Sequence, residues 1–341
     1  MLLSIFLLTV IISFIGTYAI ERIFVNCNIF IDKPSGRSSH SSAIPTAGGL
    51  AILFSYLVYV VSLSYIYNIQ ENSFFILFAA LLPIIIIGLI DDLNEINIFV
   101  RLLAQFFSAL IIIYYFQISK NIFDVNLYSQ SSFIIIFLSV LLSMWLMNLY
   151  NFMDGVDGYA SSESIFVSLS ASLIAYINDP SNLIYIYILG IGLSNIGIII
   201  RNWHPAKIFM GDTGSVSTGC ILAFFIFFSA SESVISIYTW LILLSIFISD
   251  STYTLLVRIV TKKNISMPHL THGFHILTNN KKSHLFTTKT MIIFNIIWVF
   301  PLAILSNIFM NYHIIISFIA YLPLLMYLIK IGAGLENSKI T

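Results

Sequence analysis

The chain has 341 residues, of which 59% are hydrophobic and 9% are charged. Because soluble domains carry about 25% charged residues, this composition excludes an ordinary soluble protein and indicates a membrane protein. The 15 basic and 15 acidic residues cancel, so we expect no nucleic-acid partner.

Apolar runs long enough to cross a bilayer follow one another along the whole chain. A hydrocarbon core of about 30 Å needs roughly 20 apolar residues in a helix. Eleven such runs lie near Leu2–Ile20, Ala47–Tyr67, Phe74–Ile90, Ile98–Ile118, Ser131–Tyr150, Ala160–Ile177, Leu183–Ile200, Val216–Ala230, Val234–Val257, Thr290–Ile308 and His313–Ile329. The eighth run is short, so a partly re-entrant segment and a total of ten spans form the alternative. We predict an all-α polytopic membrane protein in which residues 1–341 form a single domain.

Basic residues fall almost entirely on one side of this predicted array. When the loops alternate from an external N-terminus, only Lys120 lies on the external side. The other fourteen lie on the opposite side: Arg22, Lys33, Arg37, Arg101, Arg201, Lys207, Arg258, Lys262, Lys263, Lys281, Lys282, Lys289, Lys330 and Lys339. The positive-inside rule makes that side cytoplasmic. We therefore expect a cytoplasmic C-terminus and an active site at the cytoplasmic face.

The first cytoplasmic loop, Asp32–Gly49, has features of an anion-binding turn. Gly48 and Gly49 open the second predicted helix, where free backbone N–H groups can bind an anion. Arg37 could add a charge-assisted contact to a phosphate. A solvated linker followed by a helix start explains the same residues equally well.

The second loop, Gly88–Arg101, begins with two adjacent carboxylates. Asp91 and Asp92 directly follow an apolar run, and an unpaired carboxylate is costly to bury there. A site that holds a divalent cation or transfers a proton would favour such clustering. The alternative is that these charges only mark the membrane boundary.

The segment NLYNFMDGVDG is the only polar window between two long apolar runs. Asn148, Asn151, Asp154 and Asp157 recur every three residues, which predicts that they lie along one face of a helix end. An ordinary turn would need only a few such residues. The spacing therefore favours a functional site around this segment.

Asp212 lies in a glycine-rich segment just before the next apolar run. Gly211 and Gly214 flank it in the sequence FMGDTGS, so that one hard oxygen ligand stands among exposed backbone amides. This combination suits Mg²⁺ and a diphosphate together. The alternative is that Asp212 only caps a helix.

The last long cytoplasmic loop contains three regularly spaced histidines. His269, His272 and His275 lie three residues apart, near one face if the segment is helical. A zinc site usually includes a cysteine or carboxylate, or has more varied spacing. Contacts from the imidazoles to a phosphate, beside Lys262 and Lys263, fit the segment better, and incidental surface histidines form the other alternative.

Taken together, these motifs resemble a known family. PTAGG, GLIDD, NLYNFMDGVDG, NWHPAKIFMGDTGS and the histidine loop are similar, in this order over about Asp32–His275, to the polyprenyl-phosphate N-acetylhexosamine-1-phosphate transferase superfamily. This glycosyltransferase family 4 includes phospho-N-acetylmuramoyl-pentapeptide transferase and the enzymes that begin O-antigen and teichoic acid chains. The resemblance implies a bacterial inner-membrane enzyme that moves a sugar-1-phosphate from a UDP-N-acetylhexosamine to undecaprenyl phosphate and releases UMP.

The resemblance also implies roles for individual residues. Asp91 and Asp92 match paired aspartates that deprotonate or orient the lipid phosphate, and the three histidines match a catalytic loop near the diphosphate and sugar. Asp212 matches the Mg²⁺ ligand, with Asp154 as a second ligand and Mn²⁺ as an alternative metal. Substrate-binding roles are expected for Arg37, Gly48, Gly49, Asn148, Asn151, Asp154, Asp157 and Lys207. The partners implied are both substrates and the lipid bilayer, and a homodimer is left open.

Two features favour the O-antigen-initiating branch. The histidines are spaced HxxHxxH rather than joined as HHH, and eleven spans are expected. The sugar of the UDP-sugar donor is not decided: it is either GlcNAc or a 6-deoxy sugar such as FucNAc or QuiNAc. Two other functions also stay open: an intramembrane Mg²⁺-dependent prenyltransferase, which the DDxxE pattern at Asp91 could suggest, and a secondary transporter. A transporter would be expected to carry polar groups near the bilayer midplane, whereas these carboxylates crowd one face.

Overall fold

The computed structural model describes residues 1–32, 43–67, 72–94, 96–120, 130–264 and 269–335. These residues form long helices and one small hairpin. In chain order they are α1 (Leu2–Cys27), β1 (Ile31–Asp32), β2 (Ile44–Pro45), α2 (Gly49–Tyr67), α3 (Asn72–Leu93), α4 (Ile98–Lys120), α5 (Gln130–Met153), α6 (Tyr159–Asn178), α7 (Ile184–Asn202), α8 (Gly211–Ser231), α9 (Ile237–Leu243), α10 (Ser245–Val260), α11 (Gly273–Lys281), α12 (His284–Phe294), the π-helical turn η1 (Asn295–Val299), α13 (Phe300–Ile308), η2 (Met310–Tyr312) and α14 (His313–Ile331).

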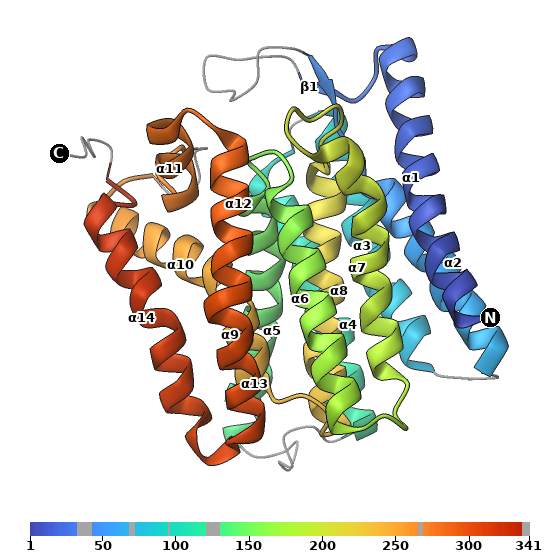
Figure 1. The fold of residues 1–341 in the computed structure, drawn as a ribbon, viewed down its shortest axis with the longest axis vertical. Coiled ribbons are helices and arrows are strands. Elements are labelled where there is room, and N and C mark those ends of the chain that lie inside the picture. The colour runs from blue at the N-terminus through green and yellow to red at the C-terminus, as the bar shows by residue number, and fades with distance from the viewer. Residues whose placement is uncertain (33–42, 68–71, 95, 121–129, 265–268, 336–341) are drawn as a thin grey trace.

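The prediction of an all-α polytopic membrane protein is confirmed. Lipid offers no partner for backbone N–H and C=O groups, so an apolar run of this length spans a bilayer as a helix. The described residues contain ten helices long and apolar enough to span, or eleven if the bent pair α9 and α10 counts as one span. In Figure 1, α1 begins towards one end of the bundle and α14 ends at the other, as an odd number of crossings requires.

The irregular span is the ninth rather than the eighth. The expectation of a short eighth span was wrong, because α8 includes the polar segment from Gly211 to Ser215 and extends over 21 residues. The chain instead breaks between α9 and α10, whose axes differ by 77°. The polar first turn of α8 is thus part of a regular helix, and Asp212 lies at its N-terminus.

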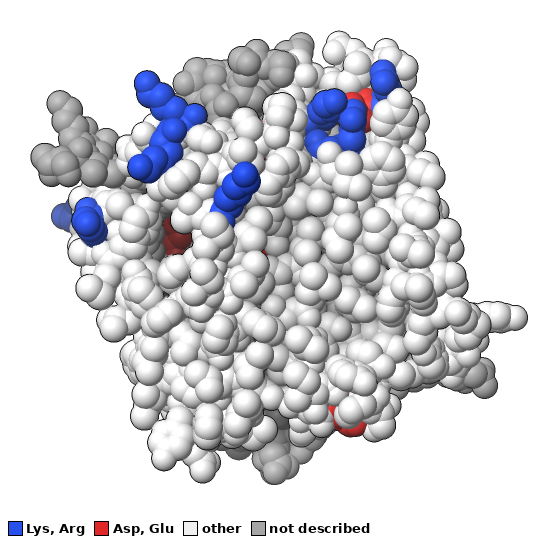
Figure 2. Space-filling view, viewed as in Figure 1, with Lys and Arg blue, Asp and Glu red and all other residues white. Residues whose placement is uncertain are grey.

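Helix α8 forms the centre of the bundle. It packs against α2, α3, α4 and α5, and its side chains Phe224, Phe225 and Phe227 are fully buried. Helices α1 and α14 lie on opposite sides of the bundle (Figure 1) and expose apolar side chains such as Ile11 and Phe318. Apolar patches of this extent are rare on soluble monomers and are the expected surface for contact with lipid. Lys and Arg gather at one end of the face shown in Figure 2.

We expect Gly49→Ala to prevent correct folding. A Cβ at position 49 would overlap the Gly214 Cα, where α2 crosses α8. Because the obstructing atom belongs to the backbone, the cost should exceed the roughly 1–3 kcal/mol of ordinary overpacking. Expression and the thermal unfolding midpoint in detergent provide the measurement. Gly16→Ala is the matched control, since its Cβ would lie 3.3 Å from the Ala51 Cβ and 3.7 Å from the Ala51 Cα. Equal behaviour of the two variants would contradict the prediction.

Candidate active site

A network of charged and amide side chains joins four helices at the end of the bundle that carries the basic residues. Arg101, in the first turn of α4, pairs through Nη1 with Asp91 Oδ2 at 2.9 Å and through Nη2 with Asp212 Oδ2 at 2.8 Å. Arg101 also donates to Asn151 Oδ1 at 3.0 Å. Asn151 in turn donates to Asp212 Oδ1 at 2.8 Å. The network therefore brings together residues from three motifs that are far apart in the sequence.

Asp92 differs from Asp91 because its carboxylate accepts hydrogen bonds from the first turn of α8. Its Oδ1 accepts a hydrogen bond from the Asp212 N–H at 2.9 Å. Its Oδ2 accepts from the Thr213 N–H at 3.1 Å and from Thr213 Oγ1 at 2.6 Å. A carboxylate at a helix N-terminus is stabilised by the free N–H groups and by the helix dipole. Asp92 thus orients the turn that carries Asp212, whereas Asp91 pairs with Arg101.

A cavity of about 290 Å³ opens beside this network. Asp92, Asn151, Asp154, Asp157 and Asp212 all contribute to its lining. Burial raises the pKa of Asp154 well above its ordinary value, and the neighbouring carboxylates raise it further. So many carboxyl groups around one small space repel one another, and a bound cation would relieve this repulsion. Their oxygen-only donor set fits the Mg²⁺ that the motifs predict.

The predicted helical face in the central motif is only partly present. Helix α5 ends at Met153, so Asn148 and Asn151 lie on the helix while Asp154 and Asp157 lie in the loop that follows. Asn148 does not reach the cavity, since its Nδ2 donates to the Gln105 Oε1 at 2.5 Å inside the bundle. The helix stops because the glycines and aspartates after Met153 favour turns over helix.

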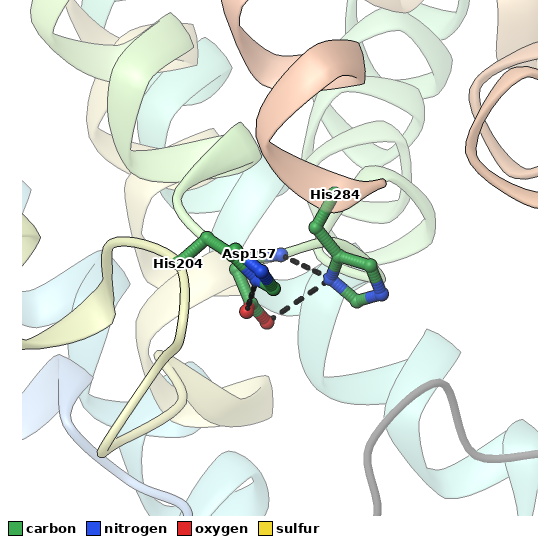
Figure 3. A group of neighbouring side chains, drawn as sticks. All are labelled: Asp157, His204 and His284. Atoms are coloured by element: carbon green, nitrogen blue, oxygen red, sulfur yellow. Dashed lines mark hydrogen bonds and ion pairs between the residues drawn. The ribbon is translucent and has the colours of Figure 1, made fainter. Parts of the chain in front are cut away.

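Two histidines hold Asp157 (Figure 3). His204 Nδ1 lies 2.7 Å from Asp157 Oδ2, and His284 Nδ1 lies 3.2 Å from Oδ1. Burial would raise the pKa of Asp157, but hydrogen bonds from His284 and His204 outweigh it and lower that pKa below its ordinary range. Sequence reasoning missed both histidines. His204 lies inside the NWHPA motif and could have been singled out there, whereas His284 is 127 residues from Asp157 and carries no local signal.

The histidine loop is anchored by Asp250 of α10. Its Oδ1 accepts from the Gly273 N–H at 2.7 Å and its Oδ2 from the Phe274 N–H at 2.8 Å, at the start of α11. His272 is the N-cap of α11 and His275 lies in its first turn. His275 lines the cavity beside Gly155. The three predicted histidines therefore lie together, but only His275 contributes to the cavity wall.

His269 and His275 are neutral at physiological pH. Burial, followed by the nearby His272, lowers the pKa of His275 to about 3 and that of His269 to about 4. Neutral imidazoles can donate or accept hydrogen bonds at a phosphate, but they do not add positive charge there.

The remaining predicted residues lie outside this cavity or outside the described residues. The N–H groups of Gly48 and Gly49 donate to the carbonyls of Phe209 and Met210 at 3.0 and 2.9 Å, so they dock α2 against the start of α8. Lys207 is exposed and does not line the cavity. Arg37 lies outside the described residues.

Asp92→Asn should lower stability more than Asp91→Asn does. The Asn side chain would turn one N–H donor toward the donors of the first turn of α8, and leaving a buried donor there without an acceptor costs about 1–3 kcal/mol. The measurement is the thermal unfolding midpoint of the purified protein in detergent. An Asp92→Asn midpoint equal to that of wild type would show that the carboxylate does not support α8.

Acid should destabilise the protein partly through His275. Its folded-state pKa lies below the value of about 6.5 in an unfolded chain, so the unfolded state binds more protons between these values. Stability therefore falls as the pH drops below about 6.5. We expect His275→Gln to show a smaller decrease in unfolding midpoint than wild type between about pH 7 and pH 5. Parallel decreases in both proteins would contradict this assignment.

The chain is similar to known bacterial transferases. Residues 74–230 match the model of glycosyl transferase family 4. A probable undecaprenyl-phosphate N-acetylglucosaminyl 1-phosphate transferase of Bacillus subtilis is 29% identical, over 98% of this chain and 92% of the relative. An undecaprenyl-phosphate alpha-N-acetylglucosaminyl 1-phosphate transferase of Thermotoga maritima is 28% identical over 79% of each chain. A phospho-N-acetylmuramoyl-pentapeptide-transferase of Oceanobacillus iheyensis is 24% identical, over 80% of this chain and 89% of the relative.

Proposed function

We propose that this chain, whose residues 74–230 match the model of glycosyl transferase family 4, transfers a HexNAc-1-phosphate from a UDP-sugar to undecaprenyl phosphate. In this reaction an oxygen of the lipid phosphate attacks the β-phosphorus of the UDP-sugar. The bond from that phosphorus to the oxygen bridging the two phosphates breaks, and UMP leaves with the bridging oxygen. GlcNAc is the first sugar to test, because two of the relatives carry N-acetylglucosaminyl in their names; FucNAc and QuiNAc follow.

The observation that carries the proposal is the convergence of Asp91, Asp92, Asn151, Asp154 and Asp212 at one end of a helix bundle whose sides are apolar. A lipid phosphate can reach this end from the bilayer, and a nucleotide sugar can reach it from the cytoplasm. Holding both substrates beside the same carboxylates supplies proximity and orientation. A prenyltransferase or a transporter leaves the histidine loop and the Asp212 motif without a role.

Asp91 acts as the base that orients the lipid phosphate and accepts its proton. Arg101 forms ion pairs with both Asp91 and Asp212. It therefore fixes the position of the base for the lipid phosphate relative to the carboxylate proposed to hold the metal at the UDP-sugar. The neutral His275 hydrogen-bonds the diphosphate or the sugar from the opposite wall. Asn151 fixes the carboxylate of Asp212, and Asp92 fixes the helix turn on which that carboxylate lies.

Asp212 would hold Mg²⁺, or Mn²⁺ in its place, with Asp154 as the second ligand. When bound it would neutralise the diphosphate and the charge that develops on the departing UMP. Lys207 and Arg37 are proposed to contact the substrates, as the resemblance to the family implies.

The cellular setting belongs to the same proposal. Residues 1–341 act as one transferase domain in the bacterial inner membrane, with the N-terminus outside and the C-terminus in the cytoplasm. The product is the first lipid-linked sugar of a cell-surface polysaccharide such as an O-antigen. A homodimer is compatible with one complete site in each chain.

A donor panel tests the proposal. Purified protein in detergent is incubated with undecaprenyl phosphate, Mg²⁺ and labelled UDP-GlcNAc, UDP-FucNAc or UDP-QuiNAc. We expect a labelled lipid product and one equivalent of UMP from one donor. Release of UDP in place of UMP, or no lipid product with any donor, would refute it.

A further inference from the structure

Three side chains from separate segments meet beside the cavity, which Asp157 lines. Asp157 comes from the loop after α5, His204 from the loop after α7, and His284 from the first turn of α12. Each offers one ligand atom, and these three atoms all lie within 4.8 Å of one another. Figure 3 shows both imidazole rings turned toward the same carboxylate.

The donor types differ from those around Asp212. Two imidazole nitrogens and one carboxylate oxygen form a set that Zn²⁺, Co²⁺ and Ni²⁺ prefer, whereas Mg²⁺ prefers oxygen ligands alone. The carboxylate carries a negative charge, and its ion-pair partners among the described residues are these two imidazoles. A dication would therefore meet one anionic and two neutral ligands.

The spacing is close to that of a metal site. Bonds of about 2.0–2.2 Å in a tetrahedron separate neighbouring ligand atoms by roughly 3.3–3.6 Å. The distance from His284 Nδ1 to the carboxylate, 3.2 Å, lies just below this range, and the upper limit of 4.8 Å for the set lies above it. The distance from His204 Nδ1, 2.7 Å, is that of a hydrogen bond and would lengthen by at least about 0.6 Å when a metal binds. Because the protein supplies three ligands, water can complete the tetrahedron, and the His204 side chain, which is 39% exposed, leaves an approach from solvent.

We propose that Asp157, His204 and His284 bind a dication of the Zn²⁺ type, which ties the start of α12 and the loop after α7 to the central motif. The site is separate in its ligands from the Mg²⁺ site at Asp212. It does not depend on the proposed sugar transfer, and it would hold one wall of the cavity in place. The Thr288 hydroxyl, one turn further along α12, donates to the Asp157 carbonyl at 2.9 Å and marks the same junction.

Co²⁺ is a suitable probe, because its visible spectrum reports the coordination number and the ligand types. The full-length protein is purified in detergent, stripped with a chelator and titrated with Co²⁺ in saturating Mg²⁺. We expect about one equivalent with the absorption of four-coordinate Co²⁺, displaced by Zn²⁺. Loss of a residue that only hydrogen-bonds a metal ligand usually weakens metal binding ten- to hundredfold. We expect His204→Gln and His284→Gln each to weaken Co²⁺ binding by more than this.

Two control variants localise the binding. His313→Gln removes a ring that stacks on Tyr238 at 3.9 Å between centroids, away from the cluster, and should leave the titration unchanged. His269→Gln tests the histidine loop and should also leave it unchanged. Loss of Co²⁺ binding in His269→Gln would assign the metal to that loop and overturn the proposal.

Wild-type protein supplies a test that does not rely on variant folding. A ligand of the folded state alone raises the unfolding midpoint once its concentration exceeds the dissociation constant. We expect Zn²⁺ to raise the midpoint of stripped wild type in saturating Mg²⁺. No rise, together with equal Co²⁺ binding by wild type and the His204→Gln/His284→Gln double variant, would show that the cluster is a metal-free hydrogen-bond network. The transfer assay in Mg²⁺ judges the proposed function independently.

Discussion

Asp212→Asn is expected to reduce sugar-phosphate transfer by about a hundred- to a thousandfold while the protein remains folded and membrane-inserted. The substitution keeps the size of the side chain and an oxygen that can accept from Asn151, whose Nδ2 lies 2.8 Å away. It removes the negative charge proposed to hold Mg²⁺. Arg101 keeps its second partner, Asp91, at 2.9 Å, so the helix packing should survive. The measurement is the rate of labelled lipid formation over a range of Mg²⁺ concentrations.

Asp179→Asn is the matched control for this prediction. Asp179 lies in the loop between α6 and α7, at the opposite end of the bundle, where its carboxylate accepts from the Ser181 N–H at 3.0 Å. The same loss of charge there should leave the rate unchanged. Near-normal turnover by Asp212→Asn would remove Asp212 from the metal-binding role.

Asp91→Asn is expected to lower kcat/KM by about a hundred- to ten-thousandfold, the usual range for loss of a general base. The Asp91 carboxylate faces Arg101 at 2.9 Å and accepts from the Ile96 N–H at 2.8 Å. An amide can keep the second contact but cannot take up a proton. The change should therefore appear in the chemical step, with little effect on the unfolding midpoint.

The pH profile separates a base from a residue with only a structural role. Loss of a base removes the decline of kcat/KM on the acid side, because that decline reports protonation of the base in the free enzyme. A lower rate with an unchanged profile would instead assign Asp91 to positioning Arg101. Asp92→Asn is the neighbouring comparison, since its expected effect is on stability through the capping of α8.

Membrane class, helix number and motif residues could be predicted from the sequence. The apolar runs have to form helices because lipid offers no other hydrogen-bond partner for the backbone, and this constraint acts within each run. The match to family 4 over residues 74–230 confirms the family that the motifs suggest. The predicted site roles stay predictions, although Asp91, Asn151 and Asp212 do meet through Arg101.

Several predictions failed where the outcome depended on contacts between helices. The broken ninth span was not foreseen, because α9 and α10 together read as one apolar run. Asn148 and Asn151 look equivalent in sequence, yet one bonds Gln105 inside the bundle and the other bonds Asp212. The amides of Gly48 and Gly49 were expected to be free, but α2 packs so closely on α8 that carbonyls of the preceding segment accept from both.

Hydropathy and motif order are properties of the linear chain, and they were enough to predict a helical membrane protein with the motifs of a known transferase family. The contacts of each polar residue could be found only from the packing of the helices. Asp91 and Asp92 are adjacent and chemically identical, but one meets Arg101 and the other the start of α8. His284 meets Asp157 across 127 residues. Such pairings depend on distances of about 3 Å between helices, and those distances follow from how the whole bundle packs.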